Sequence, residues 1–248
     1  MTDLSKTSVV ELSRAVLGIE TATNVVSVAI GGSAGVLGGS WVGAGRGHAE
    51  RLAPAISNLL DETGVELAEV GVIAVDVGPG LFTGIRVGVA TAKSLGQGLG
   101  VQVIAVSSLE LLAWMAIDAG WRGSVCSVVD ARRGEVFVGS FDQSRECLST
   151  TLLKPHELSR YFESLERPLL AVGNGVLRYR DELDSRTDLS IAGDALASPS
   201  ATALVSIATE MVGSGIAPSE PNAISALYMR DADAKVNWVR RDETPVAG

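Results

Sequence analysis

Two carboxylates stand where apolar segments end, a position that suits phosphate or metal chemistry. Glu20 ends the segment 15–20 and is followed by Thr21, and Asp130 ends the segment 124–130. A carboxylate there can order a water molecule or a Mg²⁺ ion beside the phosphates of a nucleotide. A lone acid can equally cap the turn that follows it, and we favour this structural role for both acids. Nucleotide binding by Glu20, Thr21 and Asp130 is the alternative interpretation.

A Gly-Pro-Gly turn is the second candidate for phosphate chemistry. Gly78 and Gly80 follow an apolar strand and precede a helix of small residues, so backbone N–H groups at the helix start could face an anion. The same glycines could let the helix pack closely on the strand, which we favour. A dinucleotide-binding pattern requires G-x-G-x-x-G and an acid at the end of the next strand. It is excluded because the last glycine is Gly84, one position too late, and no acid ends the next strand. A P-loop is excluded because Ala92 instead of glycine directly precedes Lys93-Ser94, and Val87 stands where the first glycine of the motif belongs.

Histidine and cysteine are too few to build a transition-metal site. The chain holds only His48 and His156, and its two cysteines, Cys126 and Cys147, lie in different segments. We expect both thiols to be structural and expect no cofactor. His48 follows a glycine at a predicted helix start, where we expect a surface or interface residue without a chemical role.

The elements that would position these groups occur twice. Segments 15–20 and 25–30 predict a hairpin, and segments 124–130 and 135–141 repeat it. Residues 72–108 predict a strand, helix and strand, and the strand-glycine-helix pattern recurs at 171–176. Further helices are predicted at 109–119, after the Ser-Pro-Ser cap at 198–200, and before Gly64. In the helix before Gly64, Leu52, Ile56 and Leu59 form an apolar stripe. The sequence therefore predicts an α/β protein of two similar halves.

Composition limits the function further. The 248 residues are 46% hydrophobic with a mean hydropathy of +0.29, which is ample for a core. A net charge of −9 has the wrong sign for binding a nucleic-acid backbone, so we expect a partner protein to hold any nucleic acid. No signal-like segment or uncharged apolar run of membrane-spanning length is present, so we expect a cytoplasmic protein without membrane contact.

Four motifs occur in the order of a known family. They are GIETAT at 18–23, GHAERL at 47–52, GPGLFTGIR at 78–86 and DARRGE at 130–135, followed by LYMR at 227–230. Together they resemble the TsaB (YeaZ) family over roughly residues 16–230. The resemblance implies an actin-like ATPase (ASKHA) fold of two ribonuclease H-like domains, here 15–107 and 108–231. An N-terminal extension, 1–14, and a flexible tail, 232–248, would flank them.

The resemblance also implies a partner. The TsaB family is similar to the TsaD family, whose members transfer a threonylcarbamoyl group to N6 of adenosine 37 in tRNAs reading ANN codons. We expect this chain to be a noncatalytic dimerisation subunit that pairs with a TsaD-like subunit and helps to recruit a TsaE-like ATPase. Transfer RNA would be held only through the complex, and the chain alone would form a homodimer. The implied interface helices, about 50–63 and 85–99, give as candidate contacts Leu52, Ile56, Leu59, Arg86, Val89 and Lys93.

Other functions stay open at this point. In the catalytic relatives a histidine pair binds the metal, and the matching positions here are Ser108 and Leu112, neither of which can replace an imidazole. A metalloprotease is therefore disfavoured. A stand-alone actin-fold ATPase or phosphotransferase using Glu20, Asp130 and the glycine turns is one alternative. A homodimeric binding module that ignores TsaD is another.

Overall fold

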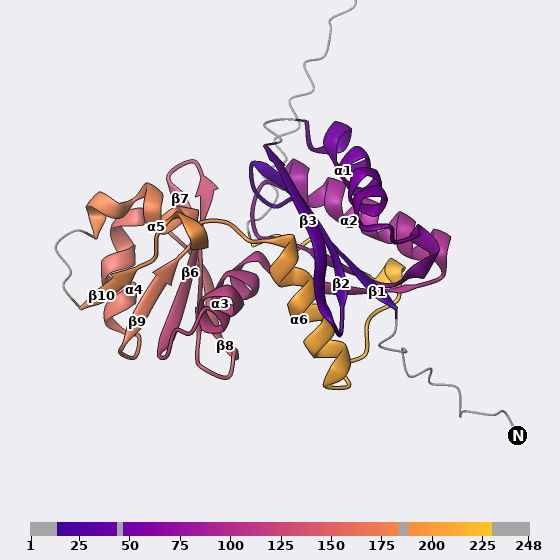
Figure 1. Cartoon of the computed structure of the whole chain (residues 1–248). Coiled ribbons are helices and arrows are strands. Elements are labelled where there is room, and N and C mark those ends of the chain that lie inside the picture. The colour runs from indigo at the N-terminus through magenta and orange to yellow at the C-terminus, as the bar shows by residue number, and fades with distance from the viewer. Residues whose placement is uncertain (1–13, 44–46, 184–187, 230–248) are drawn as a thin grey trace, which may run out of the picture.

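The computed structural model describes residues 14–43, 47–183 and 188–229, which form two mixed β-sheets beside one another (Figure 1). The predicted extension and tail lie outside the described residues, apart from Arg14. The first sheet consists of β1 (Ala15–Glu20), β2 (Val25–Gly32), β3 (Gly35–Gly43), β4 (Val70–Asp76) and β5 (Gln102–Val106). The second consists of β6 (Ser124–Arg132), β7 (Glu135–Phe141), β8 (Cys147–Leu153), β9 (Leu169–Val172) and β10 (Leu189–Ile191).

Both sheets have the same topology. The first has the strand order β3-β2-β1-β4-β5, and the second has the equivalent order β8-β7-β6-β9-β10. In each, the first strand pairs antiparallel with its hairpin partner and parallel with the strand on its other side. This duplication confirms the two ribonuclease H-like halves of an actin-like fold. Both hairpins and the strand-helix-strand unit occur where the sequence predicts them.

Helices cover both faces of the first sheet. α1 (His48–Thr63) and α2 (Phe82–Leu99) lie on one face, and α6 (Ala201–Gly213) lies on the other (Figure 1). Since both faces are covered, the central strands read as continuous apolar runs. α1 starts earlier than its apolar stripe suggests and ends at Thr63, where the C-cap Gly64 has a left-handed φ of 69° that suits glycine.

The chain returns to the first sheet after building the second. α6 belongs by sequence to the expected domain 108–231, but it packs against β1 and β2, where Ala201, Leu204 and Val205 are buried. The segment after α6 also stays on the first half, since Val103 and Ser219 exchange two backbone hydrogen bonds. The expected boundary at 107 therefore assigns this last part of the chain to the wrong half.

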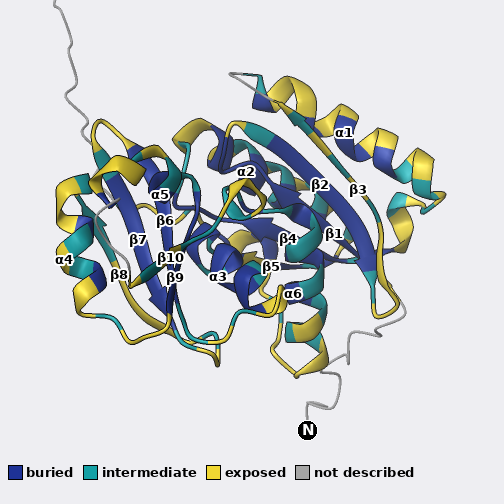
Figure 2. Ribbon diagram, turned by 60° about the vertical axis from the view of Figure 1, so that its left-hand side comes forward, coloured by how far each residue is buried: buried dark blue, intermediate teal, exposed yellow. Residues whose placement is uncertain are grey.

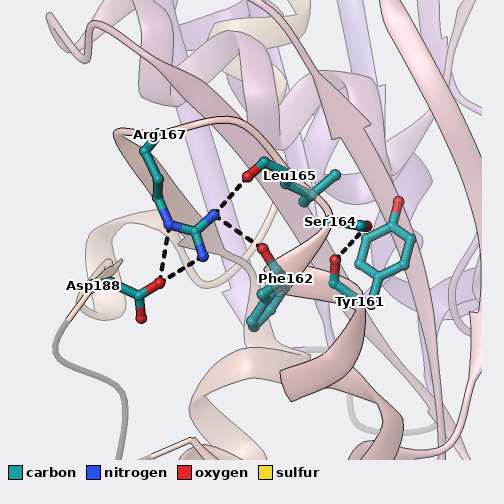
Figure 3. Close-up of polar contacts among 6 residues, drawn as sticks. All are labelled: Tyr161, Phe162, Ser164, Leu165, Arg167 and Asp188. Carbon is teal, nitrogen blue, oxygen red and sulfur yellow. Dashed lines mark hydrogen bonds and ion pairs between the residues drawn. The ribbon is translucent and has the colours of Figure 1, made fainter.

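The second sheet is covered by α3 (Ser108–Asp118) on one face and by α4 (Leu158–Glu163) and α5 (Asn174–Arg178) on the other. Arg167 organises the end of α4, as Figure 3 shows. Its Nη1 donates to the carbonyl oxygens of Phe162 and Leu165 at 2.9 and 2.7 Å, and its Nη2 pairs with Asp188 at 2.7 Å. One guanidinium thus satisfies carbonyls at the helix end and fixes the chain that leads to β10.

Candidate functional site

Two carboxyl groups meet at the ends of parallel strands in the first half. The register pairs Ile19 with Val75, so Glu20 and Asp76, one residue further, lie beside each other. Both are fully buried. Glu20 Oε1 accepts from the N–H of Ala22 at 2.7 Å, whereas its Oε2 has no hydrogen-bond partner among the described residues. The Glu20 carboxylate thus caps the turn that follows it, as the structural interpretation expects.

Asp76 is bonded more fully than Glu20. Its Oδ1 accepts from the N–H of Gly78 at 2.7 Å, and its two oxygens lie 2.7 and 2.8 Å from the hydroxyl of Ser108. Burial raises the pKa of Asp76 to about 7. Burial also raises the pKa of Glu20 well above its ordinary value, and the charge of Asp76 raises it further. The pair therefore holds protons to higher pH than exposed carboxyls do.

Gly80, just before α2, and Gly84, within it, pack against the β1–β2 turn. A methyl group on Gly80 would overlap the carbonyl oxygen of Ala22, and one on Gly84 would overlap that of Thr21. The Thr21 hydroxyl donates to the carbonyl of Gly84 at 2.8 Å, and Leu81 N–H donates to the carbonyl of Ala22 at 2.7 Å. The chain's own turn thus occupies the place where a phosphate would approach these glycines.

Gly78 is held by internal bonds in the same way. Its N–H is bonded to Asp76, and its carbonyl accepts from the N–H of Ser108 at 2.8 Å. Its φ of 96° is one that a side-chain-bearing residue rarely adopts. The N–H groups of Gly78 and Leu81 are therefore already satisfied, which leaves fewer donors for an anion.

His48 differs from its sequence-based expectation. It is buried rather than on the surface, and its Nε2 lies 2.7 Å from the carbonyl oxygen of Thr23. A carbonyl only accepts, so Nε2 carries a proton and donates it. The expectation of a surface or interface residue is wrong because this imidazole anchors the β1–β2 turn to the start of α1.

Asp130 lies in β6 of the second half, whereas the other predicted nucleotide-binding residues lie in the first half. Its side chain is 6% exposed and lies between two arginines, Arg132 at 3.4 Å and Arg178 at 3.5 Å. Its own N–H donates to Asn174 Oδ1 at 2.8 Å. Arg132 also reaches Asn24 in the β1–β2 turn at 3.4 Å, so this contact joins the two halves. Asp130 is thus already neutralised by cations of its own chain.

The positions that match a metal pair have structural roles. Ser108 is bonded to Asp76, and Leu112 is buried in the core of the second half. Within residues 14–43, 47–183 and 188–229, no three histidine, cysteine, aspartate or glutamate side chains gather so that they could bind one metal ion. In the same residues, no helix has the length and apolar character needed to cross a bilayer. Cys126 is buried, Cys147 is exposed, and both are free thiols.

Four of the six predicted interface residues face inward. Leu52, Ile56 and Leu59 of α1, and Val89 of α2, are buried in the core of the first half. They are not available to a partner, so their assignment as contact residues is corrected. The outward side of α1 is exposed along its length (Figure 2). The reason is that the apolar stripe of α1 is used for the domain's own sheet.

Lys93 and Arg86 remain on the accessible side of α2. The ammonium of Lys93 donates to the carbonyl oxygens of Asn222 and Ile224 at 3.3 and 3.0 Å, next to η5 (Pro221–Ala223). Lys93 therefore ties the returning chain to α2. Arg86 is exposed, and it lies against two exposed rings, those of Phe82 and Tyr228.

Several of these residues escaped the sequence analysis. Asp76 ends an apolar strand just as Glu20 does, and that pattern could have identified it. Asn174 lies in the glycine repeat at 171–176, but its bond to Asp130 depends on how β6 and β9 pair. Phe82 and Tyr228 had no local signal, because their partnership joins positions far apart in the chain.

Comparisons with known proteins agree on one family. The model of the family described as "TsaD: tRNA N6-adenosine threonylcarbamoyltransferase" matches residues 42–238. The "tRNA threonylcarbamoyladenosine biosynthesis protein TsaB" of Escherichia coli (strain K12) is 27% identical over 221 residues, covering 87% of this chain and 94% of that protein. The protein of the same name from Bacillus subtilis (strain 168) is 28% identical over 200 residues, covering 78% and 84%.

A solved structure agrees with these relatives. The structure titled "YeaZ from Pseudomonas aeruginosa" is 29% identical to this chain and has a TM-score of 0.72. The match covers 87% of this chain and 99% of that one. Sequence and backbone similarity therefore extend over both halves.

Proposed function

We propose that this chain, which belongs to the TsaD family and within it to the TsaB (YeaZ) proteins, is the noncatalytic partner of a TsaD-like catalytic subunit. Its role lies in tRNA threonylcarbamoyladenosine biosynthesis, the process named for both curated relatives. The partner and the absence of catalysis are our proposal. The heterodimer would recruit a TsaE-like ATPase, and the chain alone would pair with a second copy through the same face.

The observation that carries the proposal is that the candidate nucleotide positions of the first half, and one position of the expected metal pair, are bonded to groups of this same chain. The β1–β2 turn bonds to Leu81 and Gly84 at the start of α2, and Ser108, at a position of the expected metal pair, bonds to Asp76. The groups at positions where catalytic relatives would bind a ligand are here hydrogen-bonded to one another. A net charge of −9 also supports contact with tRNA through the partner only.

The partner surface in this proposal is the outward side of α2. Thr83, Ala90 and Ser94 are exposed there, and such small side chains let another helix approach closely. Phe82, Leu227 and Tyr228 form an exposed cluster at the N-terminal end of the helix. Exposed apolar side chains grouped in this way are typical of an interaction site.

The test is binding to the TsaD-like protein of the same cell. Light scattering should give the mass of a one-to-one complex, and Ala90→Arg should weaken it at least tenfold, because a long charged side chain holds the helices apart. Ala68→Arg, at an exposed position of η1 (Leu67–Glu69), is the matched control and should bind normally. Each isolated variant should keep its melting temperature within a few degrees.

The enzyme alternative has its own outcome in this experiment. If the wild-type chain ignores the TsaD-like protein at micromolar concentration, and alone binds and hydrolyses ATP, the stand-alone ATPase is correct. If it neither binds that protein nor turns over ATP, but forms dimers, the homodimeric binding module is correct.

A further inference from the structure

We propose that Arg86 is a preorganised receptor for a carboxylate, and that the carboxylate belongs to an acidic side chain of the partner protein. This inference rests on the proposed function and names the chemistry of the contact. It depends on three features of α2 and the returning chain: the fixed orientation of the guanidinium, its open donors, and the charge of the surrounding surface.

The orientation of Arg86 is fixed by two rings. Its guanidinium carbon lies 3.7 Å from the centroid of the Phe82 ring, one helical turn earlier, and 5.8 Å from that of Tyr228. The two rings lie 5.4 Å apart at an angle of 43°. Arg86 Nε donates to the Tyr228 hydroxyl at 3.0 Å. Stacking and this hydrogen bond hold the planar group before any partner arrives.

The remaining donors of Arg86 are open. The hydrogen bond to Tyr228 uses one of the five N–H groups, and the two terminal nitrogens have no hydrogen-bond or ion-pair partner among the described residues. Two parallel N–H groups match the two oxygens of a carboxylate. A side chain ordered in advance loses less entropy on binding, so its contact contributes more affinity.

Charge and polarity favour an acidic side chain on a protein. α2 contains Arg86 and Lys93 and has no acidic residue, although the whole chain carries −9. The ammonium of Lys93 is already bonded to backbone carbonyls, so Arg86 is the cation that α2 offers outward. Phe82, Leu227 and Tyr228 beside it are 51, 41 and 50% exposed. An apolar rim of this kind suits a protein surface, where it is buried together with the ion pair.

The experiment compares Kd for the TsaD-like protein across conservative variants. Arg86→Lys keeps the charge but loses the stack and the paired donors, and should weaken binding at least tenfold. Tyr228→Phe keeps the ring and loses only the hydroxyl, and should weaken it about threefold. Two controls lie in the second half: Arg160→Gln at an exposed position, and Tyr161→Phe, which removes the hydroxyl from a half-buried ring; both should leave Kd unchanged. The salt dependence of Kd should be shallower for Arg86→Gln than for the wild type.

The outcomes separate this inference from the proposed function. If the wild-type chain does not bind the TsaD-like protein, both are overturned. If it binds and Arg86→Lys binds equally well, the partner role stands and the carboxylate receptor is wrong. Melting temperatures of the isolated variants check folding, and we expect them unchanged because these side chains lie at the surface. Weaker binding of Arg86→Lys at an unchanged melting temperature supports the receptor.

Discussion

Replacing Asp76 by asparagine should remove part of the pH dependence of stability. The carboxyl group is fully buried, and its pKa is raised to about 7 from an ordinary value of 3.8. An amide fits the same contacts, because its oxygen accepts from Gly78 N–H and its NH₂ donates to the Ser108 hydroxyl. The variant therefore keeps the hydrogen bonds and loses the titration.

The sign follows from proton linkage. Between pH 4 and 7 the folded wild type keeps a proton on this group that the unfolded chain has released. The free energy of unfolding therefore falls as pH rises, by up to about 1.4 kcal/mol per pH unit for one proton. Over the three units of the Asp76 shift, the total reaches at most about 4 kcal/mol. The stabilisation is complete below pH 4 and is lost as pH rises through 7.

The assay is urea unfolding followed by circular dichroism at several pH values from 5 to 8 and constant ionic strength. The variant should exceed the wild type in stability least at pH 5, and its advantage should grow by up to about 1.4 kcal/mol per pH unit until pH 7. Asp61→Asn, at an exposed position of α1, is the control and should run parallel to the wild type. If Asp76→Asn also runs parallel to the wild type, the buried pair does not hold a proton and the reasoning fails.

Two further changes test the packing. Gly84→Ala should lower the free energy of unfolding by about 1–3 kcal/mol, because the methyl group overlaps the Thr21 carbonyl. Gly98→Ala, in the same helix with open space around it, should raise the free energy of unfolding by about 0.5–1 kcal/mol. Equal melting temperatures for these two variants would contradict the packing role. Ile56→Asp should destabilise the isolated chain by more than about 3 kcal/mol, because it buries an unpaired charge, whereas the exposed Ser57→Asp should change stability by less than about 0.5 kcal/mol. A folded, stable Ile56→Asp protein would show that this face of α1 is not core.

The sequence predicted elements better than it predicted contacts. The hairpins and the strand-helix-strand unit follow from local patterns, and the Ser200 hydroxyl does cap α6 by accepting from Thr202 N–H. The wrong assignments concern the neighbours of an element. An apolar stripe on α1 shows that Leu52, Ile56 and Leu59 are covered, but the period does not say whether a sheet or a partner covers them. The place of α6 on the first sheet had no local signal, because it depends on where the chain returns.

Glycines let a helix pack closely on a strand or turn in both halves, but the acidic residues of the two halves have different surroundings. In the second half, methyl groups on Gly173 or Gly175 would crowd the carbonyl oxygen of Val128 in β6, as those on α2 would crowd the first turn. The glycines are therefore explained by packing in both repeats, whereas the acids differ. Glu20 is fully buried with no cation beside it among the described residues, and the buried Asp130 lies between two exposed arginines. A Mg²⁺ ion would have to enter a closed core at the first and displace two cations at the second. Both costs work against nucleotide chemistry in this chain and leave the exposed side of α2 as the surface through which it would act.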